Sequence, residues 1–156
     1  MRIYLLAVGR RVPAWAQAGF TEYARRLSGA VRLDLITVAS GYRGKGDTPA
    51  KARQTEGQRL LDAIPSGCLP VALDESGSHW STARLAKNLS NWMRSGDDLA
   101  LLVGGADGLS KPCLDHAKQC WALGPLVYPH ALVRVIVAEQ LYRAWTMVNG
   151  HPYHRA

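Results

Sequence analysis

The feature of this sequence that most limits its fold is a wholly apolar run that ends in a glycine-rich turn. Residues 99–103 read Leu-Ala-Leu-Leu-Val, and residues 104–108 read Gly-Gly-Ala-Asp-Gly. A strand without polar side chains must be covered on both faces, and such strands are typical of parallel sheets that lie between two layers of helices. The run therefore predicts an α/β fold.

Alternation of strand-like and helix-like segments continues along the whole chain. Apolar or alternating runs predict strands at residues 3–8, 31–39, 69–73 and 99–103. Helical spacing, with start and stop signals, predicts helices between Pro13 and Ser28, at 50–64, between Ser81 and Gly96, at 109–120 and at 131–148. The segment 121–128 is short, and Pro125 argues against an interior sheet position there because proline has no backbone N–H to donate. We expect one domain, residues 1–156, with a mostly parallel sheet flanked by helices.

Positive charge is concentrated in the first part of the chain. The 19 Lys and Arg residues outnumber the 12 Asp and Glu residues, for a net charge of +7. Residues 1–60 hold 11 basic and 4 acidic side chains, whereas residues 61–156 hold 8 of each. This asymmetry suggests a polyanion as partner, with nucleic acid the first candidate. The candidate phosphate contacts are Arg10, Arg11, Arg25, Arg26, Arg43, Lys45, Lys51 and Arg53. For each of them, the alternative is a solvated surface charge that contacts no partner.

Several classes of protein are disfavoured. A chain that is 47% hydrophobic and 20% charged is not largely disordered. The N-terminal apolar run is interrupted by Gly9-Arg10-Arg11, too early for an export signal, and no stretch approaches the roughly 20 apolar residues that span a bilayer. Cys68, Cys113 and Cys120 fit no zinc pattern. We expect a soluble cytoplasmic protein with reduced thiols, no membrane segment and no metal.

The glycine-rich turn is the first candidate site. Ligands of open α/β sheets gather at the carboxyl ends of the strands, where this turn is expected to lie. Its spacing, G-G-x-x-G, differs from the G-x-G-x-x-G of dinucleotide sites, which argues against a Rossmann-type enzyme. A tight turn without any ligand remains an open alternative.

The last helix and the C-terminus supply the other candidates. Leu132 and Ile136 lie opposite Val137 and Leu141 on the helix, so it is apolar on two sides and suited to burial between two layers, one of which can be a partner subunit. In the same helix, the i,i+4 spacing of Glu139 and Arg143 allows a simple ion pair. The terminal His-Pro-Tyr-His-Arg-Ala concentrates groups that stack on bases, titrate near neutrality or bind phosphate, although many termini are merely solvated.

Motifs spread over the whole chain are similar to those of one family. They are Ala7-Val8-Gly9, Arg43-Gly44-Lys45, Leu73-Asp74, Leu102-Val103-Gly104-Gly105-Ala106-Asp107-Gly108-Leu109, Pro129-His130-Ala131-Leu132-Val133-Arg134-Val135, Ala138-Glu139-Gln140-Leu141-Tyr142-Arg143-Ala144 and Pro152-Tyr153-His154-Arg155. Together they resemble the ribosomal large-subunit methyltransferase H type of the SPOUT superfamily. The resemblance implies a homodimeric α/β-knot enzyme with a C-terminal trefoil knot. It implies methylation by S-adenosyl-L-methionine of N3 of a pseudouridine in 23S rRNA, in a stem-loop at the subunit interface of the assembled ribosome.

Site residues follow from the matching motifs. The resemblance implies that the cofactor contacts Leu73, Gly104, Gly105, Gly124, Pro125, Leu126, Val127, Tyr128 and Pro129. Because the methyl group of a sulfonium is already electrophilic, the reaction needs no metal. The nucleophilic nitrogen must lose a proton, which His154 can accept, while Arg155 or Arg143 stabilises the anion and Tyr153 stacks or donates a hydrogen bond. The resemblance places these groups across the dimer interface. The alternative from another class is a non-catalytic, ribosome-associated RNA-binding factor on the same fold.

Overall fold

Residues 1–155 are described by the computed structural model of this chain, and Ala156 lies outside the described residues. Strands and helices alternate along the chain. In order, they are β1 (Arg2–Val8), α1 (Ala14–Arg26), β2 (Arg32–Val38), α2 (Pro49–Asp62), β3 (Cys68–His79), α3 (Thr82–Ser95), β4 (Asp98–Val103), α4 (Lys111–His116), β5 (Gln119–Ala122), α5 (His130–Val148) and the 3-10 helix η1 (Pro152–Arg155).

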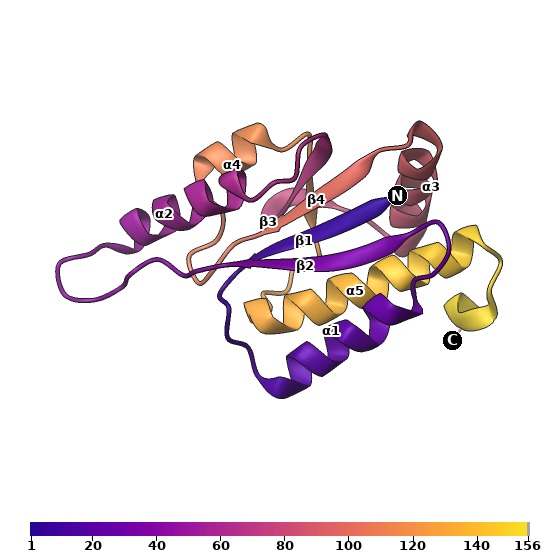
Figure 1. The fold of residues 1–156 in the computed structure, drawn as a ribbon, viewed down its shortest axis with the longest axis horizontal. Coiled ribbons are helices and arrows are strands. Elements are labelled where there is room, and N and C mark those ends of the chain that lie inside the picture. Colours follow the sequence, from indigo (N-terminus) through magenta and orange to yellow (C-terminus); the bar gives the residue numbers. More distant parts are fainter. Residues whose placement is uncertain (156) are drawn as a thin grey trace.

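The strands form one sheet in the order β2-β1-β4-β3-β5, and every neighbouring pair of strands is parallel (Figure 1). The prediction of a mostly parallel sheet flanked by helices is thus confirmed. The apolar run 99–103 is β4, which pairs with β1 on one side and β3 on the other. Its residues are between 0% and 5% exposed, because helices cover both faces of this central strand.

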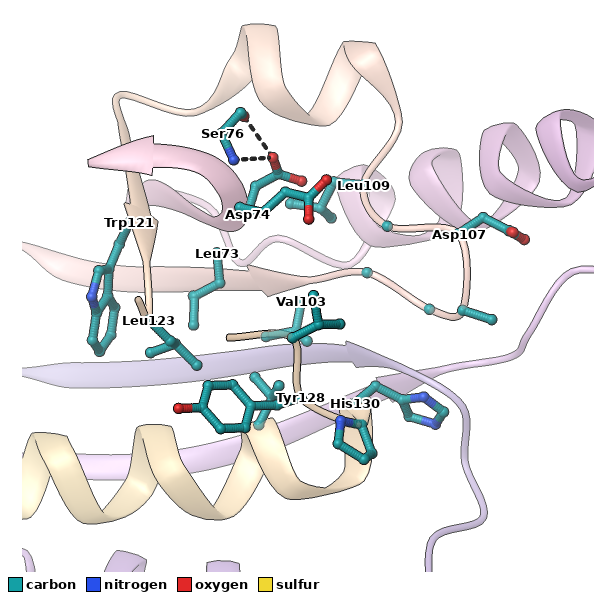
Figure 2. Close-up of a pocket in the computed structure, with 18 of the residues that line it drawn as sticks. Leu73, Asp74, Ser76, Val103, Asp107, Leu109, Trp121, Leu123, Tyr128 and His130 are labelled. Carbon is teal, nitrogen blue, oxygen red and sulfur yellow. Dashed lines mark hydrogen bonds between the residues drawn. The ribbon is translucent and has the colours of Figure 1, made fainter. Parts of the chain in front are cut away.

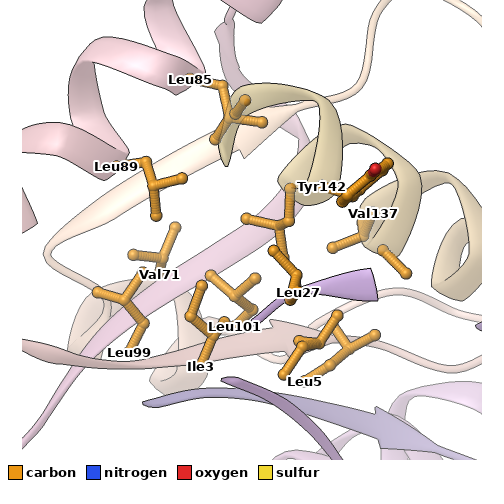
Figure 3. Close-up of a cluster of buried hydrophobic side chains, with 14 of the residues drawn as sticks. Ile3, Leu5, Leu27, Val71, Leu85, Leu89, Leu99, Leu101, Val137 and Tyr142 are labelled. Carbon is orange, nitrogen blue, oxygen red and sulfur yellow. The ribbon is translucent and has the colours of Figure 1, made fainter. Parts of the chain in front are cut away.

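Side chains alternate between the two faces of the sheet. Ile3 and Leu5 belong to a large cluster with the buried faces of α1, α3 and α5, part of which is shown in Figure 3. Leu6 and Val8 belong to a smaller cluster that includes residues of α2 and α4. Each fully buried Leu contributes about 1.5–3 kcal/mol relative to an exposed one, so the two clusters hold the layers together.

Local signals explain most helix ends. The Ser81 hydroxyl accepts a hydrogen bond from the Arg84 backbone N–H at 3.1 Å, which caps the start of α3. Gly96 ends α3 with φ of +77°, a conformation that costs glycine little. Thr48 caps α2 in the same way as Ser81 caps α3. These boundaries agree with the sequence-based expectation to within a few residues.

The expectation for residues 109–120 is wrong. The helix α4 covers only Lys111–His116, and the following strand β5 starts at Gln119. Gln119 and Cys120 pair with Val71 and Ala72 of β3. Pairing with a distant strand determines the conformation of this segment, and that pairing leaves no local signal in so short a run.

Strand β3 is longer than the apolar run 69–73 indicates. It continues to His79, with an irregularity between Leu73 and Ser78 where the register against β5 shifts. Since the added residues are polar and mostly exposed, hydrophobic periodicity ends before the strand does. The C-terminal trefoil knot stays a prediction. Among residues 1–155, no helix is long and apolar enough to cross a membrane.

Candidate functional site

A cavity of about 770 Å³ opens at the carboxyl ends of β3, β4 and β5, beside the start of α5 (Figure 2). Its size is typical of small-molecule sites, and its position is where open α/β sheets bind ligands. Of the nine residues predicted to contact a cofactor, eight line it: Leu73, Gly104, Gly105, Gly124, Leu126, Val127, Tyr128 and Pro129. Pro125 is exposed and does not line the cavity.

The cavity has an apolar floor and a polar edge. Leu73, Val103 and Leu123 supply apolar surface between the strand ends (Figure 2). At the edge, Oδ1 of Asp74 accepts hydrogen bonds from the backbone N–H of Ser76 at 3.0 Å and from its hydroxyl at 2.6 Å. This arrangement suits a ligand with an apolar body and a few polar groups.

The glycine-rich turn is both a tight turn and a wall of the cavity. Gly108 donates its backbone N–H to the carbonyl oxygen of Gly105 at 3.1 Å. A Cβ atom on Gly104 would lie 2.4 Å from the carbonyl carbon of Gly108, which leaves no room for a side chain. The two interpretations left open by the sequence are therefore compatible, because the turn requires its glycines and still lines the cavity.

Trp121 also lines the cavity and is stacked on Trp80, with ring centroids 5.4 Å apart. Its side-chain Nε1 is buried and has no hydrogen-bond partner among residues 1–155. A buried donor of this kind costs about 1–3 kcal/mol until an acceptor reaches it. No sequence pattern marks Trp121 as a site residue, since a tryptophan in a short apolar segment is ordinarily a core residue.

The C-terminal residues pack against α5. The Tyr153 ring lies 4.6 Å from the ring of Tyr142, and its hydroxyl donates to Oε1 of Glu139 at 3.1 Å. Arg143 donates from Nε to the same oxygen at 2.8 Å, and its guanidinium carbon lies 5.0 Å from the centre of the Tyr153 ring. The ion pair expected between Glu139 and Arg143 is present. Glu139 further holds Tyr153, a role that i,i+4 spacing did not indicate.

The surroundings of Tyr153 and Arg143 shift the pKa values of both side chains. Burial raises the pKa of Tyr153, and the neighbouring Tyr23 and Glu139 raise it further, so its phenol is a hydrogen-bond donor at neutral pH. The hydrogen bond to Glu139 raises the pKa of Arg143. Nδ1 of His154 is buried and finds no partner in the described part of the chain, while Arg155 is exposed.

Within one chain, the C-terminal tail, which begins at His151, lies apart from the cavity. Residue His130 lines the cavity at the start of α5, whereas Tyr153 packs on Tyr142, twelve residues further along. Twelve helical residues span about 18 Å. Figure 1 shows η1 and the C-terminus beyond the far end of α5. One chain therefore does not bring its four predicted catalytic residues to its predicted cofactor residues.

The eight candidate phosphate contacts fall into two groups. Several are held internally: Arg25 and Arg26 by Glu22, Lys51 by Asp47, and Arg43 by Glu56 and Asp107. Within residues 1–155, no ion pair includes Arg10, Arg11, Lys45 or Arg53, all of which are exposed. The second group remains available to a polyanion.

Arg134 is buried, at 2% exposure, and forms no ion pair within residues 1–155. Its Nη2 donates to the carbonyl oxygens of Val8 at 2.8 Å and Gly9 at 2.7 Å, which ties α5 to the carboxyl end of β1. Burial lowers the pKa of Arg134. Among residues 1–155, no group of three or more His, Cys, Asp or Glu side chains is placed to hold a metal ion.

Comparisons with known proteins identify the family of this chain. Residues 1–154 match a family described as "Predicted SPOUT methyltransferase". The chain is 54% identical over 155 residues to the protein named Ribosomal RNA large subunit methyltransferase H of Thioalkalivibrio sulfidiphilus, with 99% of both chains covered. It is 53% identical to the protein of the same name from Alkalilimnicola ehrlichii, with both chains fully covered.

A solved structure has a similar fold. The crystal structure of a methylase family protein from Neisseria gonorrhoeae matches with a TM-score of 0.53 at 14% identity, covering 90% of this chain and 80% of that one. At that level of identity the likeness concerns the fold alone.

Proposed function

The chain belongs to the SPOUT methyltransferase family and is a methyltransferase, and from this premise we propose that it methylates N3 of a pseudouridine in 23S rRNA, using S-adenosyl-L-methionine. The observation that carries the proposal is the gathering of eight of the nine predicted cofactor residues around one cavity. Relatives at about half identity over their full length are named as methyltransferases of large-subunit rRNA, which supports the substrate class.

The cavity fits the proposed cofactor in size and in chemistry. Leu73 and Tyr128 offer apolar surface to it, and the turn at Gly104 and Gly105 brings backbone close without side chains in between. Asp74 at its edge offers a carboxylate to the polar groups of the cofactor. The bound cofactor supplies an electrophilic methyl group on its sulfonium. The residues of the chain hold that methyl group in line with the base, and positioning of this kind contributes about 7–11 kcal/mol.

The tail residues act on the nucleotide. In the neutral base N3 carries a proton, which His154 accepts as general base. Arg155 or Arg143 stabilises the negative charge that develops on the base. Tyr153 keeps its proton and therefore donates a hydrogen bond or stacks, which fits its raised pKa.

The site is completed by two chains. Since about 18 Å of α5 separate cavity and tail within one chain, we infer a homodimer in which the tail of one protomer reaches the cavity of its partner. The helix is suited to such an interface: Val137 and Leu141 are buried within the chain, while Leu132 and Ile136 on its other side are only half-buried.

Substrate binding would use the basic first part of the chain. Arg10, Arg11, Lys45 and Arg53 are exposed and form no ion pair within residues 1–155, as suits phosphate contacts. We propose that the substrate is the subunit-interface stem-loop of the assembled ribosome, which places the enzyme in the cytoplasm. The three cysteines, Cys68, Cys113 and Cys120, are unpaired, as expected in a reducing compartment.

The test is methyl transfer from labelled cofactor to ribosomes that lack the modification. Free 50S subunits and whole ribosomes are compared, and the labelled nucleoside is identified by mass spectrometry. Label on N3 of pseudouridine in whole ribosomes is the expected result. Equal labelling of free 50S subunits would contradict the assembled-ribosome substrate, a different nucleoside would contradict the target atom, and no label in either would overturn the proposal.

A further inference from the structure

The side chain of Arg43 joins three segments that lie far apart in the sequence. It belongs to the basic loop, residues 39–48, between β2 and α2. Nη1 and Nη2 donate to the two carboxylate oxygens of Glu56 in α2, at 2.6 and 3.1 Å. Nε and Nη2 donate to Oδ2 of Asp107 in the glycine-rich turn, at 3.0 and 2.9 Å. With a further bond from Nη1 to the carbonyl oxygen of Gly41, all five N–H groups of the guanidinium are used.

This arrangement removes Arg43 from the candidate phosphate contacts. A guanidinium whose five donors are engaged has none left for RNA unless the network opens. Its carboxylate partner Glu56 is only 1% exposed and also accepts the backbone N–H of Gly41 at 2.8 Å. A buried carboxylate needs a cation beside it, and Arg43 supplies that cation through its ion pair with Glu56.

The three segments are also packed without intervening side chains. A Cβ atom on Gly41 would lie 2.6 Å from the carbonyl oxygen of Ala52 in α2. One on Gly105 would lie 3.0 Å from Oε2 of Glu56. The basic loop and the glycine-rich turn therefore both rest directly on α2, and Arg43 closes the gap between them.

From these contacts we propose that Arg43 is a positioning residue that makes the basic loop, α2 and the glycine-rich turn move as one unit. The inference rests on the proposed function, in which the turn contacts the cofactor and Lys45 of the loop contacts rRNA. Any shift of the loop on RNA is then transmitted to Asp107 and to the cavity wall. Affinity for the cofactor and affinity for rRNA are coupled through Arg43, and such a coupling is reciprocal.

Two variants separate the elements of the network. Asp107→Asn removes the charge that pairs the turn with Arg43, which weakens this link, and leaves the Arg43–Glu56 pair intact. Arg43→Lys keeps a positive charge beside Glu56, but an ammonium cannot bridge two carboxylates as the planar guanidinium does. Each variant is expected to weaken cofactor binding, measured by calorimetry, about tenfold. Asp115→Asn, which removes the carboxylate of an exposed ion pair in α4, is the matched control and is expected to bind as the wild type does.

The double variant distinguishes positioning from direct contact. If Asp107 acts through Arg43, the Arg43→Lys, Asp107→Asn protein binds the cofactor no more weakly than either single variant. If Asp107 itself holds the cofactor, the two losses multiply, and the inference is overturned. In wild type, unmethylated ribosomes are expected to tighten binding of S-adenosylhomocysteine, and this effect disappears in both single variants.

Hydrogen exchange of the free protein supplies a readout that needs neither ligand. Amides of residues 104–109 are expected to exchange faster in both variants than in the wild type and in the Asp115→Asn control, while α1 and α3 are unchanged. Unchanged exchange in the turn would overturn the inference. Wild-type protein that neither binds the cofactor nor methylates ribosomes would overturn the proposed function, and the exchange rates would still decide whether Arg43 holds the turn.

Discussion

The hydroxyl of Tyr153 donates a hydrogen bond to Oε1 of Glu139 over 3.1 Å, which ties the C-terminal segment to α5 of its own chain. The same carboxylate oxygen receives Nε of Arg143 at 2.8 Å. Glu139 thus orients two of the four predicted catalytic residues at the end of α5 that lies away from the cavity. These side chains do not line the cavity of their own chain, as a site shared between two chains requires.

Mixing two defective subunits tests this division. Deleting residues 151–156 removes the tail, and Gly104→Ala damages the cavity, so each homodimer is expected to lose methylation. A heterodimer of the two retains one intact cavity and one intact tail, which meet only if the site forms between chains. Co-purified, differently tagged subunits are expected to recover a measurable part of the wild-type rate. Methylation by the tail-deleted homodimer would contradict the assignment of the tail.

Glu139→Gln is expected to lower kcat for methylation about 100-fold, because loss of the carboxylate charge frees Arg143 and Tyr153 to move and small misplacements of catalytic groups are costly. Cofactor affinity, measured by calorimetry, is expected to change less than twofold. Asp62→Asn, which alters an exposed carboxylate of α2 that accepts from Gln58, is the control. A normal kcat in Glu139→Gln would show that this carboxylate does not orient the tail.

The raised pKa of Tyr153 predicts a dependence of stability on alkaline pH. A phenol with a folded-state pKa above its ordinary value of 10.0 contributes stability that is complete below pH 10 and declines as the pH rises above it. The difference in unfolding free energy between wild type and Tyr153→Phe is therefore expected to be constant from pH 7 to 9 and smaller at pH 10.5. Urea denaturation at fixed protein concentration measures it, and a difference that grows with pH would contradict the assignment.

Gly104→Ala is expected to destabilise the protein by about 1–3 kcal/mol, since the new methyl group overlaps the backbone of Gly108. It is expected to weaken cofactor binding as well, because the turn lines the cavity. Gly67→Ala is the control: φ is +81° there, and no heavy atom lies within 4 Å of the added methyl group, so stability falls by about 1 kcal/mol while cofactor affinity is unchanged. Equal cofactor affinity in both variants would exclude the turn from the cofactor site.

Salt dependence tests the basic surface. Lys45→Gln is expected to weaken ribosome binding and to reduce the slope of log affinity against log salt concentration by about one, as loss of one phosphate contact does. Lys111→Gln, which removes an exposed charge from α4, serves as control and is expected to leave the slope unchanged. Identical slopes for Lys45→Gln and the wild type would remove Lys45 from the rRNA-binding surface.

Local patterns were sufficient for most of the fold. The apolar run 99–103 predicted a central parallel strand because burial on both faces excludes polar side chains. Ser81 and Gly96 marked the ends of α3, since capping depends on atoms a few residues apart. The motifs that resemble those of the family likewise predicted most of the residues around the cavity. The turn after β4 and the loop before α5 each carry such a motif in consecutive residues.

Other features depended on residues that are distant in the sequence. Gln119 and Cys120 form a strand because β3 pairs with them, although the segment reads as a continued helix. Arg43 serves an internal network because folding brings it to Glu56 and Asp107, 13 and 64 residues away. The separation of tail and cavity follows from the length and direction of α5. Helix capping and the apolar pattern of a strand depend on residues close together in the sequence. Strand pairing, the neutralisation of buried charges and the distance between tail and cavity depend on which segments the tertiary fold places side by side.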